Sequence, residues 1–519
     1  MRRRVVVVGY GMVGARFAEE VRRRDPDGTR VALTVLGMED RPAYNRVLLS
    51  TVLAGGLTPQ AVQMHDVGWA AEHRVDVRTG VAVIRIDRRR RVVHAADGTA
   101  VPYDDLVLAT GSRAWLPPVV GLADPPRLAP GTTPTRARRY PDSRRPGPGV
   151  AVFRDLDDCA RILDMARPGA RLAVVGGGLL GLEAARGLAG RGVEVTLVHP
   201  CEHLMERQLD AGAGAVLAAV VGKLGIALRM GAGATAWAPG TGLTCDDGAM
   251  LDVDGVIVAA GVYAETGLAA DAGIDVDRGV LVDDRLATSA PRVYAVGDCA
   301  QHAAAPAGLV QPGWEQAAVL ADLLTDHDPA ARYRGTRAVT RLKARDVDLA
   351  VVGDGLAGED ATDPETELLR FTDARRGRYA SLALRDDLVV GGIVIGFPDA
   401  AATLIQLHDS GQPAPADRLA LLFGRALPGE AAPTSDPGRL PAAAVVCRCN
   451  TVTKGALVSA WRAGATDAAA LRRATRAGTG CGSCVDTVAG ICDWLAGADP
   501  DPPAALVGVP GGHEEEGAA

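Results

Sequence analysis

Short aliphatic runs alternate with helical stretches at the start of the chain. Residues 4–9 form a β-branched run, residues 12–24 read as a helix, and residues 31–36 form a second aliphatic run. Strand–helix–strand order predicts a parallel sheet with helices on both of its faces.

The same order recurs about one domain further along the chain. Residues 171–175 and 193–198 read as strands, and residues 182–190 between them read as a helix. A glycine-rich turn at residues 176–181 joins the first strand to this helix. A repeat of this size indicates duplication of a whole domain rather than a short solenoid repeat. The predicted fold class is therefore α/β, with two dinucleotide-binding, Rossmann-like domains.

The second half of the chain has a different pattern. Short β-like runs at 349–352, 380–384 and 388–395 are followed by a helix near 399–409. Strands mixed with a helix in this way predict a small α/β domain over residues 336–425.

Three segments lack any apolar period. Residues 123–149 are rich in Pro, Gly and Arg and are expected to form a mobile insertion loop, either a solvated surface loop or a basic docking patch for an acidic partner. Residues 426–442 have the composition of a linker, and residues 497–519 are expected to be a disordered tail. Between the linker and the tail, residues 443–496 are expected to form a small, helical, cysteine-bearing domain.

Composition narrows the class of protein. The 519 residues are 48% hydrophobic and 23% charged, as in a globular protein of several domains. The net charge of −7 disfavours a nucleic-acid partner, and no apolar run reaches the ~18 residues of a membrane span. Residues 2–8 resemble the start of a signal peptide, but Gly9, Tyr10 and Gly11 interrupt the run. We therefore expect a buried first strand and a cytoplasmic protein.

The first strand runs into the motif Gly9-Tyr10-Gly11-Met12-Val13-Gly14. Glycines at these positions allow a tight turn and close approach of a pyrophosphate, and the N-terminus of the following helix offers unpaired N–H groups. Glu39, beyond the next strand, is placed to accept hydrogen bonds from ribose hydroxyls. The pattern predicts a dinucleotide site, the alternative being a glycine-rich turn without a ligand.

The second motif, at residues 176–181, reads Gly-Gly-Gly-Leu-Leu-Gly. Here the second strand ends at His199 instead of a carboxylate, which weakens the case for NAD. Arg207 could bind a 2′-phosphate or could be a surface residue. The choice between NADH and NADPH stays open at this stage.

Three further segments pair with these motifs. Residues 105–111 and 256–261 each read as a strand followed by a turn, and residues 292–298 read as a strand, a turn and an acid. With two nucleotide motifs, the chain resembles the flavoprotein reductases that have two dinucleotide-binding domains. The resemblance implies FAD and NAD(P)H as cofactors, and it implies that Asp298 binds the ribityl chain of FAD.

The implied ligands fall into two sets. The residues implied to bind FAD are Gly9, Gly11, Met12, Val13, Gly14, Glu39, Arg46, Thr110, Gly111, Gly297 and Asp298. The residues implied to bind NAD(P)H are Gly176, Gly178, Leu179, Leu180, Gly181, His199, Arg207 and Gly261.

A closer resemblance rests on longer motifs. Residues 39–46 (EDRPAYNR), 178–183 (GLLGLE) and 204–210 (LMERQLD) resemble the large subunit of assimilatory NAD(P)H nitrite reductases and the reductase subunit of assimilatory nitrate reductases. Residues 336–425 resemble the C-terminal domain of NADH:rubredoxin reductases. These resemblances imply an FAD domain at 1–122 plus 263–330 and an NAD(P) domain at 150–262.

The sequence departs from related reductases near the expected flavin. Thr51 stands where they often have Lys, and residues 1–60 hold no C-x₄-C pair, so we do not expect a redox disulfide. Glu183 is implied to lie beside the nicotinamide, the alternative being a carboxylate on the surface of a helix.

Four of the nine cysteines form two pairs, Cys447-x-Cys449 and Cys481-x-x-Cys484. Four thiolates suit zinc or an iron–sulfur cluster, although C-x-C is tighter than the usual zinc spacing. The flanking residues resemble bacterioferritin-associated ferredoxin, which implies a 2Fe-2S cluster. Structural zinc and free thiols are the alternatives.

The domain order indicates an electron path from NAD(P)H through FAD and 2Fe-2S to an external acceptor. The leading hypothesis is an electron-supplying subunit for an assimilatory nitrate or nitrite reductase, since the C-x₅-C and C-x₃-C pairs of the nitrite-reducing domains do not occur in this sequence. The alternative is a reductase of ferredoxin or rubredoxin type. A docking or redox-sensing module is a third hypothesis, disfavoured by the intact glycines of both motifs. A homodimer is possible under each.

Overall fold

The computed structural model divides into two compact units, Met1–Glu430 and Ala431–Ala519. Each unit is described by itself. The residues that the structure describes are 2–124, 145–303, 308–357, 365–423, 437–448, 450, 452–480, 482 and 484–498.

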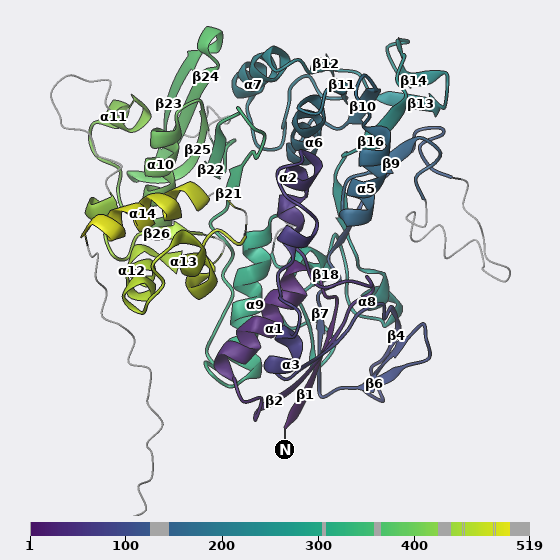
Figure 1. Cartoon of the computed structure of the whole chain (residues 1–519), viewed down its shortest axis with the longest axis vertical. Helices are drawn as coiled ribbons and strands as arrows, with labels where there is room; N and C mark the ends of the chain where they lie inside the picture. Colours follow the sequence, from purple (N-terminus) through teal and green to yellow (C-terminus); the bar gives the residue numbers. More distant parts are fainter. Residues whose placement is uncertain are drawn as a thin grey trace, which may run out of the picture. The chain divides into compact units, whose positions relative to one another are not determined.

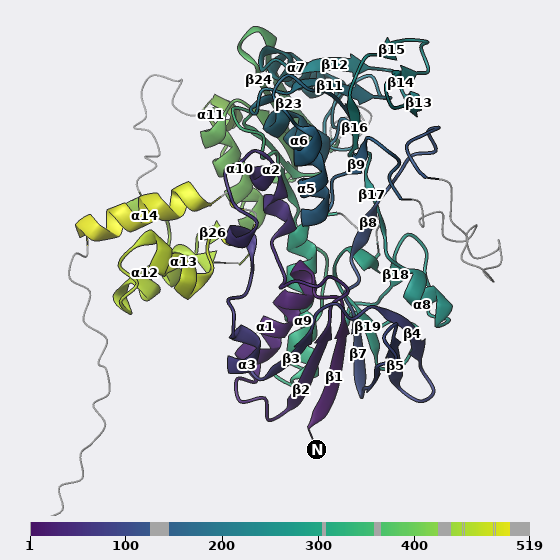
Figure 2. The ribbon, with the colours of Figure 1, turned by 45° about the vertical axis from the view of Figure 1, so that its right-hand side comes forward.

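The first sheet of the first unit contains five parallel strands in the order β19-β7-β1-β2-β3, of which β7, β1 and β2 are labelled in Figure 1. Their bounds are β1 Arg3–Val8, β2 Val31–Leu36, β3 Val75–Arg78, β7 Asp105–Leu108 and β19 Val293–Ala295. Side chains alternate across a strand, so each face of the buried β1 has its own core. Val5 and Val7 pack against helices α1 (Met12–Arg24) and α9 (Val310–Leu324), which lie side by side (Figure 2).

The opposite face of this sheet is covered by a small antiparallel sheet. Val6 and Val8 of β1 share a core with residues of this sheet, which consists of β4 (Val83–Asp87), β5 (Val92–Ala95) and β6 (Ala100–Pro102). One aliphatic strand therefore supports both layers.

The second sheet repeats this architecture. Its five parallel strands have the order β12-β11-β10-β16-β9, and an antiparallel sheet, β13-β14-β15, covers one face. The strand bounds are β9 Val150–Val152, β10 Arg171–Val175, β11 Glu194–His199, β12 Ala227–Met230, β13 Ala234–Ala238, β14 Gly242–Cys245, β15 Met250–Leu251 and β16 Gly255–Val258. The helices of this region are α5 Leu156–Met165, α6 Leu179–Ala189 and α7 Ala211–Lys223. The duplication predicted from the sequence is present in the fold.

Two short strands connect the halves that carry these sheets. β8 (Ser112–Ala114) leads out of the first half and β17 (Val262–Ala264) leads back, and the two pair antiparallel. The remaining elements of this region are η1 Arg46–Leu48, α2 Leu49–Leu53, η2 Gln60–Val62, α3 Trp69–Glu72, α8 Gly267–Asp271, β18 Val280–Leu281, η3 Gly297–Cys299 and β20 Ala300–Gln301.

The small α/β domain predicted at 336–425 is built on an antiparallel sheet of five strands in the order β21-β22-β25-β24-β23. The element bounds are β21 Val339–Arg341, β22 Leu349–Gly353, β23 Thr366–Asp373, η4 Ala374–Arg376, β24 Arg378–Arg385, β25 Leu388–Ile395, α10 Pro398–Ser410 and α11 Arg418–Phe423. Strands β21 and β23 are not predicted by the sequence pattern. No residue of β23 is buried, and half of its residues are exposed, so it lacks an aliphatic run.

The second unit contains a two-stranded ribbon and three helices. The elements are η6 Pro437–Arg439, β26 Val445–Cys447, β27 Val452–Thr453, α12 Lys454–Arg462, α13 Ala468–Thr475 and α14 Val485–Ala498. Thr453 caps α12 and Asp467 caps α13, each by accepting a backbone N–H. The core includes Leu457, Leu471 and Ile491.

The three segments without an apolar period are described only at their edges. Most of the predicted insertion loop, most of the linker and nearly all of the tail lie outside the described residues. At the loop, Ala123 bridges to Pro146. At the linker, Lys454 donates to the carbonyls of Gly438 and Leu440.

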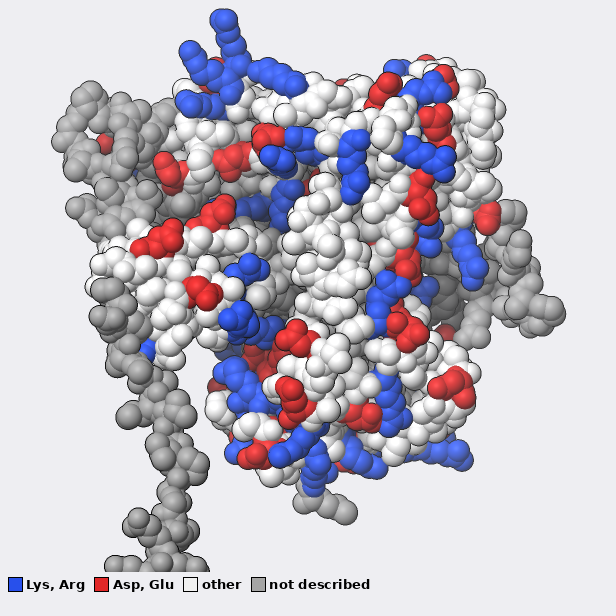
Figure 3. All heavy atoms as spheres, in the orientation of Figure 1, with Lys and Arg blue, Asp and Glu red and all other residues white. Residues whose placement is uncertain are grey.

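No helix among the described residues is long and apolar enough to cross a bilayer. On the face shown in Figure 3, acidic and basic side chains are interspersed.

Candidate functional site

The first glycine turn lies between β1 and α1, at the carboxyl end of its sheet. Gly9 has φ +115°, and a Cβ there would lie 2.1 Å from the carbonyl oxygen of Ala109. A Cβ on Gly14 would lie 2.0 Å from the oxygen of Gly9, whereas a Cβ on Gly11 would meet nothing within 4 Å. The turn is therefore closed behind Gly9 and Gly14 and open in front of Gly11, where the N-terminus of α1 begins. Such an opening suits the pyrophosphate of a dinucleotide.

The second turn, between β10 and α6, repeats this stereochemistry. Gly176 has φ +121°, and its Cβ would lie 2.4 Å from the oxygen of Ala259. A Cβ on Gly181 would lie 1.9 Å from the oxygen of Gly176, and a Cβ on Gly178 would meet nothing within 4 Å. The two turns therefore offer the same cradle.

The residues between the turn glycines differ in burial. Met12 is buried, and Val13 lies beside Gly297, whose Cβ would stand 2.9 Å from Val13 Cγ2. The N–H of Gly297 donates to Gln316 of α9 (2.7 Å). This packing brings Asp298, far away in sequence, next to the first turn. On α6, Leu180 is 40% exposed beside the second turn.

Glu39 follows β2 and forms a cluster with two residues of the EDRPAYNR motif. It accepts a hydrogen bond from Tyr44 Oη (2.8 Å) and forms an ion pair with Arg46. The Arg46 guanidinium also lies over the Tyr44 ring, 5.2 Å from its centroid. Burial raises the pKa of Tyr44, so the phenol keeps its proton and donates to Glu39. The predicted ribose acid is held in one orientation and is only partly exposed.

Asp298 lies in the helical turn η3 after β19 and is held from two sides. Its Oδ2 accepts from Ser112 Oγ (2.7 Å) and from Arg154 (3.0 Å). Nearby, Thr110 Oγ1 donates to the carbonyl of Glu265 (2.8 Å), and the N–H of Glu265 donates to Gly111 (2.9 Å). The strand–turn segments predicted at 105–111 and 292–298 therefore meet near the pair β8–β17.

Glu183 lies on α6 and is 8% exposed. Its Oε1 accepts the backbone N–H of Lys343 (3.1 Å), in the segment between β21 and β22. This carboxylate is therefore buried rather than on a helix surface, and it ties α6 to the C-terminal sheet. Thr51 lies on α2, which packs against α6.

His199 ends β11 and is 5% exposed. Its Nδ1 accepts the N–H of Gly177 (3.1 Å), and its Nε2 lies 3.0 Å from Glu206 Oε2. The side chain of Arg207 is 81% exposed and approaches Glu206 only to 3.9 Å. Sequence reasoning missed Glu206, although it stands in the LMERQLD motif.

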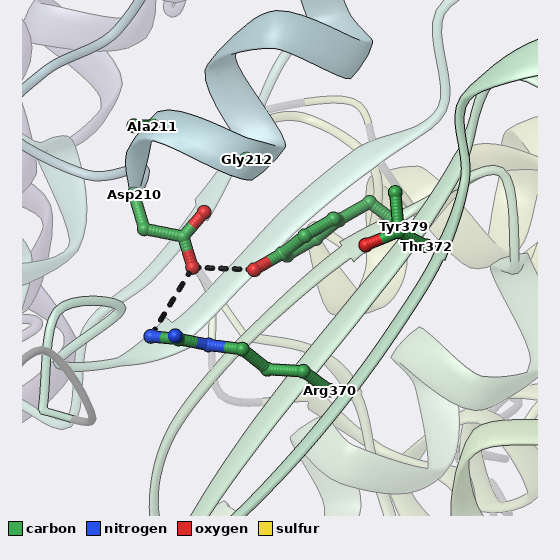
Figure 4. Close-up of a pocket in the computed structure, with 6 residues that line it drawn as sticks. All are labelled: Asp210, Ala211, Gly212, Arg370, Thr372 and Tyr379. Carbon is green, nitrogen blue, oxygen red and sulfur yellow. Dashed lines mark hydrogen bonds and ion pairs between the residues drawn. The ribbon is translucent and has the colours of Figure 1, made fainter. Parts of the chain in front are cut away.

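A cavity in the first unit, shown in Figure 4, lies at the start of α7. It measures about 440 Å³ and is lined by residues of α7, β23 and β24. Asp210 caps α7 by accepting the N–H of Ala213 (2.7 Å), accepts from Tyr379 Oη (2.5 Å) and lies 3.7 Å from Arg370. The cavity therefore surrounds a structural link between α7 and the C-terminal sheet.

In the second unit, Cys447 ends β26 and Cys484 precedes α14, and both are buried. A hydrogen bond from Cys484, with others from Gly478 and Asn450, outweighs burial and lowers the pKa of Cys447 to about 6. Asn450 Nδ2 lies 3.7 Å from Cys447 Sγ. The paired thiols and nearby N–H donors fit a site for a thiolate-bound metal or cluster. Cys449 and Cys481 lie outside the described residues.

Comparison with known proteins finds two family models that match separate parts of the chain. Residues 3–320 match the family model of the pyridine nucleotide-disulphide oxidoreductases, and residues 445–494 match the BFD-like 2Fe-2S binding domain. The chain is 32% identical to the NAD(P)H nitrite reductase of Bacillus subtilis (96% of this chain, 58% of the relative). It is 30% identical to the assimilatory nitrate reductase electron transfer subunit of the same organism (97% and 61%). The chain thus spans less than two thirds of the length of these relatives.

Solved structures show the same fold at lower identity. The covalent complex of putidaredoxin reductase with putidaredoxin matches with a TM-score of 0.65 at 23% identity, over 79% of this chain and 94% of that chain. NADH:rubredoxin oxidoreductase from Clostridium acetobutylicum matches with a TM-score of 0.61 at 20% identity, over 80% and 96%.

Proposed function

Because the chain belongs to the pyridine nucleotide-disulphide oxidoreductase family, we propose that it oxidises NAD(P)H and supplies the electrons to the catalytic component of an assimilatory nitrate or nitrite reductase. Its cofactors are FAD, NAD(P)H and a 2Fe-2S cluster. The observation that carries the proposal is the combination, on one chain, of two equivalent glycine cradles with a buried pair of thiols.

The first cradle is proposed for FAD. Gly11 and the N-terminus of α1 would bind the pyrophosphate. Glu39, held by Tyr44 and Arg46, would accept hydrogen bonds from the ribose hydroxyls. Asp298 would accept from the ribityl chain. The Arg154 guanidinium, 3.0 Å from Asp298 Oδ2, holds the carboxylate in place.

The second cradle is proposed for NAD(P)H, with Gly178 and the N-terminus of α6 at its pyrophosphate. When bound, FAD accepts a hydride from the nicotinamide, and the 2Fe-2S cluster carries electrons singly. The part played by the protein is to orient the two nucleotides, for which no acid–base pair is required. Glu183 is proposed to lie beside the nicotinamide and to hold the segment near Lys343 in place.

Cys447, Cys449, Cys481 and Cys484 are proposed as the four ligands of the cluster. A redox disulfide has no place in this scheme, despite the family's name, because residues 1–60 contain no cysteine. A cytoplasmic location and a homodimer stay predictions.

Anaerobic reconstitution tests the proposal. Purified protein is expected to show flavin and 2Fe-2S absorption, both bleached by NADH or NADPH, and to support nitrate loss when mixed with a molybdenum nitrate reductase. Cys447→Ser should keep flavin bleaching but lose onward transfer. Cys492→Ser, in α14 of the same unit, is the matched control and should keep both. Failure of both nucleotides to bleach the flavin would overturn the proposal.

A ferredoxin- or rubredoxin-type reductase is the second candidate. It is favoured by 32% identity to the ferredoxin–NAD(+) reductase component of the biphenyl dioxygenase system of Paraburkholderia xenovorans, of which the chain covers 67%. Faster reduction of a small ferredoxin or rubredoxin than of the nitrate or nitrite reductase would favour this function.

A further inference from the structure

The end of β11 lacks the carboxylate that usually accepts the adenosine ribose of NAD, because His199 stands there. The hydrogen bonds around this histidine define its tautomer. Nδ1 accepts the N–H of Gly177 (3.1 Å), so the proton of the neutral ring lies on Nε2. Nε2 then donates to Glu206 Oε2, 3.0 Å away. His199 therefore holds the carboxylate of Glu206 beside the strand end, where the residue of the strand itself is not an acid.

The segment that carries Glu206 is fixed to the second glycine turn. The N–H of Met205 donates to the carbonyl of Gly177 (3.0 Å), and Met205 is fully buried with φ +54°. Gly177 thus uses its N–H for His199 and its carbonyl for Met205. Glu206, the next residue, is held beside the cradle with its side chain 32% exposed.

The other charged groups of this segment are placed differently. Asp210 accepts hydrogen bonds from Tyr379 Oη (Figure 4) and from the backbone N–H of Ala213 at the start of α7. The carboxylate of Glu202 lies against Gly231, whose Cβ would stand 3.0 Å from Glu202 Oε1. Arg207 is exposed to solvent. Glu206 is therefore the carboxylate of this segment that is positioned by the end of β11.

We propose that Glu206, positioned by His199, accepts hydrogen bonds from the adenosine ribose hydroxyls and makes the second cradle selective for NADH over NADPH. The inference rests on the proposed function, in that it assigns the nicotinamide nucleotide to this cradle. A carboxylate accepts from the 2′-hydroxyl of NADH. It offers no donor to a 2′-phosphate, and the two negative charges repel each other.

A metal is a competing occupant, since one ligand atom each from His199, Cys201 and Glu206 lie within 4.8 Å of one another. Binding through Nε2 would shift the ring proton to Nδ1, where it would face the N–H of Gly177. The fixed tautomer therefore favours hydrogen bonding over metal coordination.

Calorimetry with the oxidised holoprotein tests the proposal without any turnover, using ADP-ribose and 2′-phospho-ADP-ribose as probes. The wild type is expected to bind ADP-ribose about tenfold more tightly or better. Glu206→Gln should lose most of this preference, chiefly because it binds ADP-ribose more weakly. Glu206→Asp should keep part of it, and Glu202→Gln, on the same segment, should leave it unchanged.

Preference of the wild type for 2′-phospho-ADP-ribose would overturn the inference. So would a Glu206→Gln change no larger than that of Glu202→Gln, even if NADH still bleaches the flavin; the proposed function would then stand alone. Binding of neither probe, with no bleaching by NADH or NADPH, would overturn both. Should Glu206→Gln fail to fold, the wild-type ratio and the Glu206→Asp ratio decide.

Discussion

At the scale of single residues, the glycines of each turn have two distinct roles. Gly9 and Gly14 exclude a side chain because backbone oxygens lie about 2 Å from where a Cβ would stand. Gly11 and Gly178 have open space and extended backbone angles that alanine can adopt. The first role is needed for the fold, and the second becomes important only when a nucleotide approaches.

Gly11→Ala and Gly178→Ala are therefore expected to fold and to separate the two cradles. Gly11→Ala should weaken FAD binding about tenfold or more and spare ADP-ribose, because a methyl group would occupy the space proposed for the pyrophosphate. Gly178→Ala should weaken the binding of ADP-ribose and leave the binding of FAD unchanged. Flavin content after purification and calorimetry with ADP-ribose measure the two effects.

Gly222→Ala on α7 is the control, since its Cβ also meets nothing within 4 Å. It should leave both ligands bound and raise stability by up to ~1 kcal/mol, as alanine favours helix. Wild-type FAD binding by Gly11→Ala would show that the first turn does not hold the pyrophosphate.

Sequence spacing was sufficient to predict the glycine turns, because their geometry is local. It could not identify Glu206, since the role of this residue depends on His199, and the tautomer of His199 depends on Gly177, 22 residues earlier. Similarly, only the folded chain places Asp298 beside Ser112 and Arg154.

At the scale of elements, α5 begins with a capping box that contains a buried acid. Asp155 accepts the N–H of Asp158, and Asp158 accepts the N–H of Asp155. Burial, reinforced by the nearby Asp155 carboxylate and opposed by Arg161, raises the pKa of Asp158 to about 6. The cap that starts the helix is therefore sensitive to pH.

The pKa of Asp158 is 3.8 in the unfolded chain and about 6 in the folded chain. Between these values the folded state holds a proton that the unfolded state has lost, so the contribution to stability falls as the pH rises from about 4 to about 6. Asp158→Asn cannot titrate. The free energy of unfolding of the wild type should drop relative to this variant by about 1–3 kcal/mol over that range, as measured by urea unfolding.

Asp164→Asn, exposed on the same helix, is the control and should follow the wild type. A constant difference between wild type and Asp158→Asn from pH 4 to pH 7 would contradict the prediction.

Buried strands were predictable because their aliphatic runs are continuous, and β2, β10 and β25 have the predicted bounds. Helix α6 begins at Leu179 rather than at residue 182, because Gly178 of the turn is itself the N-cap. The covering sheets β4-β5-β6 and β13-β14-β15 escaped prediction. Their strands are two to five residues long and partly exposed, so neither a long run nor a clean alternation marks them.

At the scale of the whole molecule, the two units have separate cores. Leu320 of α9 is fully buried in the first unit, and Leu457 of α12 is fully buried in the second. Leu320→Ala and Leu457→Ala remove the same atoms from the two cores, and each should cost about 2–5 kcal/mol.

Scanning calorimetry is expected to show two unfolding transitions. Leu457→Ala should lower only the midpoint of the transition in which the cluster absorption is lost, and Leu320→Ala only that of the transition in which flavin is released. A single transition that shifts equally in both variants would show that the units unfold as one.

The short pair β8–β17 has a consequence for how such a protein can change. Ala114 lies opposite Val262, and the backbone N–H of Trp115 donates to the carbonyl of Gly261 (2.9 Å), so the chain leaves and re-enters the half that carries the first cradle at adjacent points. Everything between them is an insertion with neighbouring ends, the arrangement in which a domain can be exchanged without disturbing its host. A cassette from Trp115 to Gly261 contains the whole second cradle together with Glu206. Exchange of this cassette would replace the site proposed for the electron donor, provided that the incoming segment keeps an arginine at the position of Arg154, which holds Asp298 of the other half.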